Sequence, residues 1–457
     1  MFRKKYSRRE FVKKNSLAGI GAAFTMSMAP ELLANSPGAM TTPAILGGRP
    51  VRTAGWPSWP KWDEARDEEL VLKSLRSGVW SRSDLTSKFE QRWAEMIGTK
   101  RCLATVNGTN ALIAALAQLD VGGGDEVIVP PYTFIATTQA ILMNGAMPVF
   151  VDTDPETFQI DVDKIEAKIT PRTKAILPVH ILGLPANMPR IMEIARKHNL
   201  LVVEDSCQAW LAEINGKKMG SWGDAGCFSF QNSKNLAIGE GGAITSDNEE
   251  FMDRCFSYHN YGNPYGAVVG EVGAGTVRLG TKLRTTEYQS AIGLVQLERL
   301  EAETNKRNEN AAYLKSNIQD IPGILPYKLY DGVTKAAFHL FPFTYKKEEF
   351  EGLPRSGFLR ALSAEGIPAS GGYAPLNKMP YLEHAFNTRN FQKMYPAHML
   401  DYNRYMSQNQ CPVNDQVCEE AVWFSQSMLL TERSDMDDIA SAIEKIHKNA
   451  GEIRSII

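Results

Sequence analysis

The 457-residue chain lacks several features that would define its class at once. It has no uninterrupted apolar run of twenty residues, so no ordinary membrane-spanning helix is expected. It has no excess of one charge: the net charge is −2, which gives no reason to expect nucleic acid or an acidic membrane surface as a partner. We find no internal repeat and no low-complexity tract. At this length the chain can bury a large core and form two or three domains.

Cysteine is also sparse, with six residues scattered along the chain. Their spacing does not suggest a zinc site, and we expect no metal. Cys411 and Cys418 are close enough in sequence to pair in an oxidising compartment, although free or buried thiols are an equal alternative.

The first 34 residues differ in composition from the rest. Seven basic residues, Arg3, Lys4, Lys5, Arg8, Arg9, Lys13 and Lys14, precede a short Gly/Ala-rich apolar stretch at 16–29. This layout is typical of a bacterial secretory signal, and SRREFVK (7–13) resembles the twin-arginine export motif. A basic amphipathic helix is the alternative. We therefore predict a periplasmic or otherwise exported protein that contacts a membrane only through this segment. Ala34 is a candidate for the residue directly before the cleavage point. Leu32, two residues earlier, suits a cleavage site poorly, so a signal that stays attached as a membrane tether is an alternative.

Beyond the signal, the chain predicts an arm and two domains. Residues 35–62 are rich in Pro, Gly and Trp and predict an extended N-terminal arm. From residue 63, apolar strands at 126–129, 147–151, 175–179 and 200–204 alternate with helices at 65–77, 87–97, 110–118, 137–144 and 190–198. Such alternation predicts an α/β domain, residues 63–300, whose mostly parallel sheet has helices on both faces. A long helix at 286–317 leads to a smaller α+β domain, residues 301–457, with a C-terminal helix at 434–449.

Three sequence segments carry the chemistry. Lys234 lies in FSFQNSKNLAIGEGG, between a short strand and a glycine-rich turn. Asp205 ends the apolar run LLVVEDSCQA, where a carboxylate is costly unless it meets a cation or a strong donor. Gly108, Thr109 and Asn110 open a predicted helix, whose bare N–H groups favour a phosphate. An amine for an aldehyde, an acid for a pyridine nitrogen and a helix N-terminus for a phosphate are the requirements of pyridoxal 5'-phosphate (PLP).

The order of the motifs points to a known family. The segments NGTNAL, PPYTFIATTQAI, FVDTDPETFQID, VVEDSCQA, CFSFQNSKNLAIGEGGAITS and RTTEYQSAIGLVQLERL cover roughly residues 45–445. In this order they resemble the DegT/DnrJ/EryC1/StrS family of PLP-dependent sugar and cyclitol aminotransferases. The resemblance implies the PLP-dependent transferase fold of aspartate-aminotransferase type, and a homodimer with active sites at the interface.

The resemblance also implies roles for single residues. Lys234 would be the Schiff-base lysine, and Asp205 would hold the pyridine nitrogen protonated. Gln208 would donate to the phenolic oxygen of the ring. Phe134 would stack on the ring, with Tyr132 as the competing assignment. The phosphate would be bound by Gly108, Thr109 and Ser229.

Other positions are less clearly assigned by the resemblance. Relatives usually have an asparagine at the position of Lys282, and that asparagine reaches the phosphate of the partner subunit. A lysine could meet phosphate with a stronger charge or could point to solvent. His180 is either close to the site or an ordinary buried histidine, and His339 and GGYAPL (371–376) could line the substrate side.

The leading functional hypothesis is therefore a transaminase. An amino donor, glutamate or glutamine, would give its amino group to a keto-sugar or keto-cyclitol. A PLP-dependent dehydratase or epimerase is an alternative, but the known dehydratase branch has histidine where this chain has Lys234. A non-catalytic sensory protein is another, and the presence of Lys234, Asp205, Gln208 and Ser229 argues against it. Export also conflicts with nucleotide-linked sugars as substrates, because those are cytoplasmic.

Overall fold

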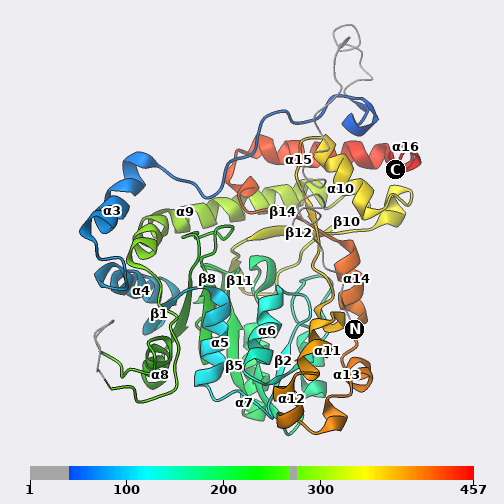
Figure 1. The fold of residues 1–457 in the computed structure, drawn as a ribbon. Coiled ribbons are helices and arrows are strands. Elements are labelled where there is room, and N and C mark those ends of the chain that lie inside the picture. Colours follow the sequence, from blue (N-terminus) through cyan, green and yellow to red (C-terminus); the bar gives the residue numbers. More distant parts are fainter. Residues whose placement is uncertain (1–40, 268–274) are drawn as a thin grey trace, which may run out of the picture.

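The computed structural model describes residues 41–267 and 275–457, and its centre is a seven-stranded sheet (Figure 1). The strands in spatial order are β1 (Arg101–Thr105), β9 (Gly242–Ser246), β8 (Ala225–Ser229), β5 (Leu201–Asp205), β4 (Thr173–Ile176), β2 (Glu126–Val129) and β3 (Met147–Phe150). Only β9 runs antiparallel to its neighbours. The predicted mostly parallel α/β sheet is confirmed.

Alternate residues of the central strands β2 and β5 enter two separate cores. Val127 and Val129 pack into one hydrophobic cluster, while Ile128 between them packs into the other. Val203 and Val202 divide in the same way on β5. This period of two places apolar side chains on both faces, as a sheet covered by helices requires.

Each face is covered by its own helices. The first core contains α5 (Gly108–Gln118), α6 (Ile135–Met143) and α8 (Glu249–His259). The second contains α4 (Asp84–Ile97), α7 (Met188–His198) and the start of α9 (Glu287–Ile318), while α3 (Glu64–Ser77) packs along α9. The predicted helices agree with these bounds to within three residues at each end.

One predicted strand differs from the structure. We predicted 175–179, but β4 ends at Ile176. Pro178 has no N–H to donate to a neighbouring strand, and Val179 forms only an isolated bridge with Asp205. The chain therefore leaves the sheet at the level of the carboxyl end of β5.

The C-terminal part has an antiparallel sheet of its own. Its strands are ordered β10 (Ile324–Pro326), β12 (Leu340–Tyr345), β14 (Ala421–Ser425) and β13 (Ser370–Gly371). Its helices are α10 (Arg355–Ala364), α11 (Tyr381–Phe386), α12 (Arg389–Met394), α13 (Tyr402–Gln408), α14 (Pro412–Glu420), α15 (Arg433–Lys448) and α16 (Ala450–Ser455). A three-stranded sheet of β11 (Val333–Lys335), β6 (Glu213–Ile214) and β7 (Lys217–Lys218) joins this part to the large sheet region. The proposed domain boundary at residue 300 lies inside α9.

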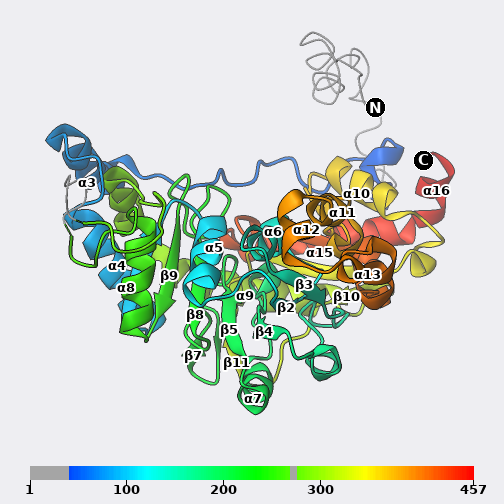
Figure 2. The same ribbon diagram turned by 60° about the horizontal axis from the view of Figure 1, so that its bottom comes forward.

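The N-terminal arm crosses the molecule from the C-terminal part to α3. Both views show this segment running from the region of α10 and α15 along the outside of the fold (Figures 1 and 2). Its described part, residues 41–62, contains only the short 3-10 turn Ala44–Leu46 before α3 begins. The bounds of the arm, 35–62, stay a prediction, because residues 35–40 lie outside the described residues.

The structure bears on the expectations for the cysteines and for membrane-spanning helices. All six cysteines are free, so Cys411 and Cys418 are thiols rather than a disulfide. Of the helices within 41–267 and 275–457, none is both long and apolar enough to cross a bilayer. The predicted export signal lies outside the described residues.

Candidate functional site

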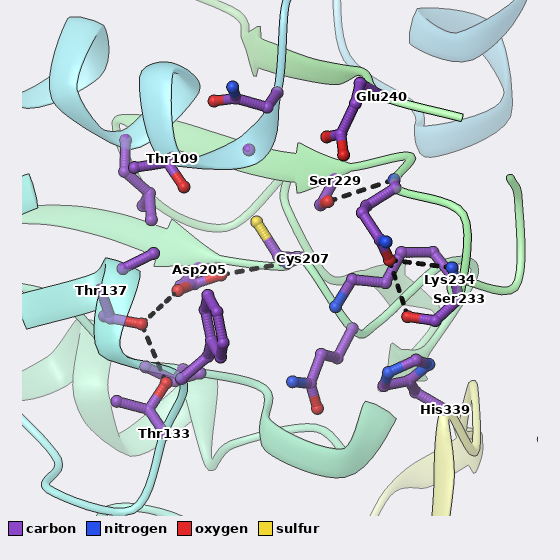
Figure 3. A pocket seen from close by; sticks show the side chains of 18 of the residues that line it. Thr109, Thr133, Thr137, Asp205, Cys207, Ser229, Ser233, Lys234, Glu240 and His339 are labelled. Atoms are coloured by element: carbon purple, nitrogen blue, oxygen red, sulfur yellow. Dashed lines mark hydrogen bonds between the residues drawn. The ribbon is translucent and has the colours of Figure 1, made fainter. Parts of the chain in front are cut away.

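The candidate site is a cavity of about 460 Å³ at the carboxyl ends of the parallel strands. This edge is where ligands bind in open α/β sheets. Figure 3 shows side chains from separate segments pointing into one space. Seven of the predicted residues line it, namely Gly108, Thr109, Phe134, Asp205, Gln208, Ser229 and Lys234.

Asp205 is held at the end of β5 by two donors. Its Oδ2 accepts a hydrogen bond from Thr137 Oγ1 at 2.7 Å, and its Oδ1 accepts one from the Cys207 N–H at 3.1 Å. Thr137 is in turn 2.9 Å from Thr133 Oγ1 (Figure 3). An ionised carboxylate has about four lone-pair sites, so Asp205 can accept a further donor from the cavity.

Glu204 points to the opposite face, as the alternation of the strand predicts. It accepts hydrogen bonds from the backbone N–H groups of Gly220, Trp222 and Gly223. It also lies 3.0 Å from His180 Nε2, and both side chains are fully buried. His180 is therefore a buried structural histidine, the second of the two alternatives.

The start of α5 forms a bare cradle beside Ser229. A Cβ atom at Gly108 would lie 2.7 Å from Cys207 Sγ and 2.8 Å from Ser229 Cβ, so only glycine fits here. The N-cap of the helix is Asn107, whose Oδ1 accepts from the Asn110 N–H at 2.8 Å. Asn110 thus supports the turn instead of lining the cavity. The free N–H groups and the positive end of the helix favour an anion.

Lys234 enters the cavity from the loop after β8. Its Nζ lies 5.9 Å from the ring centroid of Trp210. Burial lowers the pKa of Lys234, while Cys207 and Asp205 partly oppose this shift. A lowered pKa raises the fraction of neutral amine, which is the form that attacks a carbonyl or takes up a proton.

Gln208 is fixed in orientation by contacts at both ends of its amide. Oε1 accepts from the Leu182 N–H at 2.7 Å, and Nε2 donates to the Tyr373 hydroxyl at 2.9 Å. Nε2 keeps one further N–H. Phe134 lines the cavity with 58% of its surface exposed, whereas Tyr132 is fully buried in the core. The geometry favours Phe134 over Tyr132 as the stacking residue.

The Lys234 side of the cavity is polar and partly unforeseen. His339 and Tyr373 line it, as the sequence suggested. Burial, Lys234 and Arg307 lower the pKa of His339 well below its usual value, so its ring is neutral. Sequence reasoning missed five polar lining residues: Asn107, Thr133, Gln231, Ser233 and Glu240. It also missed Thr137, whose contact with Asp205 depends on how α6 packs and has no local sequence signal.

Lys282 lies apart from the cavity of its own chain. It is exposed, it is not among the residues that line the cavity, and its backbone pairs with Asn260 in an isolated bridge. Its proposed contact with the phosphate of a partner subunit stays a prediction.

Comparison with known proteins identifies the family. Residues 61–395 match the family model described as the DegT/DnrJ/EryC1/StrS aminotransferase family. The chain belongs to this aminotransferase family. It is 33% identical over 422 residues to a putative L-glutamine:3-amino-2,3-dideoxy-scyllo-inosose aminotransferase of Micromonospora echinospora, covering 90% of this chain and 98% of that protein. It is 34% identical over 426 residues to the L-glutamine:2-deoxy-scyllo-inosose aminotransferase of Streptomyces kanamyceticus, covering 88% and 96%.

Solved structures of the family share the fold. The crystal structure of 3-amino-5-hydroxybenzoic acid synthase matches with a TM-score of 0.77 and 28% identity, covering 87% of this chain and all of that one. The aminotransferase from Psychrobacter cryohalolentis matches with a TM-score of 0.74 and 31% identity, covering 87% and 99%. The aminotransferase fold expected from the motifs is therefore confirmed.

We predict that Thr137→Val weakens PLP binding by about ten-fold while leaving the fold intact. The change removes one of the two protein donors that orient the Asp205 carboxylate, so the acid is held less firmly where it would meet the ring nitrogen; a ten-fold change in affinity corresponds to about 1.4 kcal/mol. Fluorescence titration with PLP measures the affinity. Thr138→Val is the control, because Thr138 is the next residue, is equally buried and does not line the cavity. Equal effects of both changes would contradict the role of Thr137, and Asp205→Asn should slow turnover far more than either.

Proposed function

We propose that the protein is a PLP-dependent aminotransferase. The single observation that carries the proposal is that Lys234, Asp205 and the Gly108–Ser229 cradle open into one cavity. Those three groups match an aldehyde, a pyridine nitrogen and a phosphate, and the space between them is bounded by Phe134 and Cys207. The residues present therefore fit the cofactor.

In this proposal each residue has a defined task. PLP, when bound, supplies the electron sink and carries the amino group. Asp205, oriented by Thr137, would accept a hydrogen bond from the ring nitrogen. Gly108, Thr109 and Ser229 would hold the phosphate, and Gln208 Nε2 would face the phenolic oxygen. Lys234 Nζ, favoured in its neutral form by burial, would take a proton from the α-carbon of the amino donor and return one to the acceptor.

The proposed donor is glutamine or glutamate and the proposed acceptor is a keto-cyclitol or keto-sugar. The names of the relatives pair L-glutamine with scyllo-inosose compounds. The polar lining on the Lys234 side, Gln231, Ser233, Glu240, His339 and Tyr373, supports an acceptor rich in hydroxyl groups.

We further propose that two copies assemble into a homodimer with a composite site. Large apolar side chains are exposed close to Lys282. Leu279, three positions before it, is 90% exposed, and Tyr261, whose N–H donates to the Thr281 carbonyl at 3.0 Å, is 51% exposed. Trp80, 56% exposed, belongs to the segment that pairs with Thr286 through Ser81. Exposed apolar groups of this size are typical of an interface. In such a dimer Lys282 would approach the phosphate of the other subunit.

The proposed location is outside the cytoplasm, through the twin-arginine route. Arg8 and Arg9 precede a weakly apolar stretch that is too short to span a bilayer stably. That route carries folded proteins, which suits an enzyme that has already bound its cofactor. An exported enzyme would meet free or polymer-derived keto-sugars or keto-cyclitols instead of nucleotide-linked sugars.

Lys234→Ala is expected to abolish turnover and the covalent attachment of PLP by borohydride. Reduction of the PLP-loaded protein followed by peptide mass spectrometry locates the attachment. Lys217→Ala serves as the control, because Lys217 also lies over a tryptophan ring, 5.0 Å from Trp222, but outside the cavity. Attachment to any lysine other than Lys234 would end the assignment. A panel of amino acids is then added one by one to the PLP-loaded protein. The amino donor is the one that removes the visible absorbance of the bound PLP.

Lys282→Ala should leave the dimer intact and weaken PLP binding by roughly three- to ten-fold, since one charge-assisted contact to phosphate is lost. Sedimentation measures the assembly, and titration at two salt concentrations measures the affinity. Lys88→Ala, at an exposed position on α4, should change neither. A monomeric wild-type protein, or an unchanged affinity in the Lys282 variant, would remove the composite site.

Changing both Arg8 and Arg9 to lysine is expected to retain the protein in the cytoplasm with the activity of the folded part unchanged, because twin-arginine recognition is lost while the fold is not. Cell fractionation and immunoblotting measure the distribution. Unmodified protein found entirely in the cytoplasm at full length would overturn export, and nucleotide-linked sugars would then become the leading acceptors.

A further inference from the structure

The N-terminal arm is anchored to the C-terminal part of the protein by a buried acid. Glu365, fully buried, accepts hydrogen bonds from the backbone N–H groups of Ala44 at 2.7 Å and Val51 at 2.8 Å. The Lys445 ammonium lies 3.1 Å from the same carboxylate and balances its charge. At the far end of the arm, the Lys61 carbonyl accepts from Arg299 Nη2 of α9 at 3.2 Å. The arm is thus fixed at both ends.

Two tryptophans between these anchors make the same two kinds of contact: each indole N–H donates to a backbone carbonyl, and each ring lies near a guanidinium. The Trp56 indole N–H donates to the Gly366 carbonyl at 2.9 Å, and the Arg52 guanidinium lies 4.1 Å from its ring. The Trp59 indole N–H donates to a carbonyl at 3.0 Å, and the Arg307 guanidinium lies 5.5 Å from its ring. The difference is the acceptor: Trp59 binds the backbone carbonyl of Lys234.

The backbone around Lys234 is otherwise held by the loop itself and by the segment before β12. The Lys234 N–H donates to the Gln231 carbonyl at 2.8 Å within the turn. The next residue, Asn235, donates through Nδ2 to the Ala337 carbonyl at 2.8 Å, and its Oδ1 lies 3.2 Å from His339 Nδ1. Trp59 supplies a further contact to this backbone, from the arm.

The Trp59 ring has a rigid neighbour. Arg307 is fully buried, and its Nη2 and Nε donate to Gln426 Oε1 at 2.6 and 3.0 Å. Its Nη2 also lies 3.4 Å from Glu303. A guanidinium fixed in this way restricts the ring that packs against it and contributes a cation–π attraction. The indole N–H is therefore aimed at Lys234 by groups from α9 and the end of β14.

We propose that Trp59 is a positioning residue for Lys234, and that the arm braces the catalytic loop from outside the cavity. This inference rests on the proposed role of Lys234. Trp59 does not line the cavity, so it acts only through the lysine backbone. Displacement of a reacting group by about 1 Å can cost two orders of magnitude in rate, which gives a single backbone contact a measurable effect.

The test compares Trp59→Phe with Trp56→Phe in the full-length protein. Each change keeps an aromatic ring and removes one indole-to-carbonyl hydrogen bond from the same arm. Trp59→Phe is expected to lower kcat by about ten-fold with little change in the KM for the amino donor. It should also speed hydrogen exchange in the loop at 231–240. A looser loop admits water to the Lys234 amine and so raises its lowered pKa. Acetic anhydride should therefore acetylate Lys234 of the apo protein only at a higher pH than in the wild type. Trp56→Phe should change kcat and the exchange rates of this loop by no more than about two-fold, and it should leave the pH profile of Lys234 acetylation as in the wild type.

The outcomes separate the possible explanations. If both variants lose similar stability and show the same Lys234 acetylation profile, Trp59 has only a structural role and the proposal is wrong. If wild-type Lys234 does not trap PLP with borohydride, the proposed function fails, independently of the arm. Should Trp59→Phe not fold, benzothienylalanine at position 59 keeps the shape of the ring and removes only the donor. An acetylation profile unchanged by that residue would also refute the positioning role.

Discussion

The structure depends on one buried carboxylate at the carboxyl end of a central strand. Asp205 costs free energy where it lies, and the fold offsets that cost with donors from two directions, Thr137 on α6 and the Cys207 backbone. To deliver the threonine, α6 must pack against α5 on the same face of the sheet. To deliver the N–H, the chain must turn directly after β5. The carboxylate lines the cavity and can still accept a further hydrogen bond there. The residue that is costly to bury is therefore also the residue that defines the site.

Adjacent acids on β5 show how the strand separates structure from function. Glu204 is used on the other face, where three backbone N–H groups and His180 satisfy it completely. A one-residue shift of register would exchange the two carboxylates and place each among the wrong partners. The pair therefore also stabilises the register of β5.

Most of the fold and the inner part of the site could be predicted from the sequence, because their signals are local. Strand and helix periods gave the elements, and the ordered motifs indicated Lys234, Asp205 and the Gly108 cradle before any geometry was known. The partners of those residues could not be predicted in this way. Thr137 meets Asp205 across 68 positions and Trp59 meets Lys234 across 175, and such contacts arise only from tertiary packing. The predicted strand 175–179 extended past Ile176, where β4 ends, because strand periodicity takes no account of the missing N–H of Pro178.

The arm also bears on the proposed export. The Thr41 carbonyl, which accepts from Asn449 Nδ2 at 3.3 Å, and the Ala44 N–H, which donates to Glu365, follow the predicted signal segment of residues 1–34 by only seven and ten positions. Removal of that segment would leave every anchor from Glu365 to Lys61 in place, whereas export of an unfolded chain would require all of them to form afterwards. A route that transports the folded state keeps the arm on Glu365 and the Trp59 contact on Lys234 throughout. The proposed brace requires the arm to be docked during catalysis, and the proposed route would deliver the protein with the arm already docked.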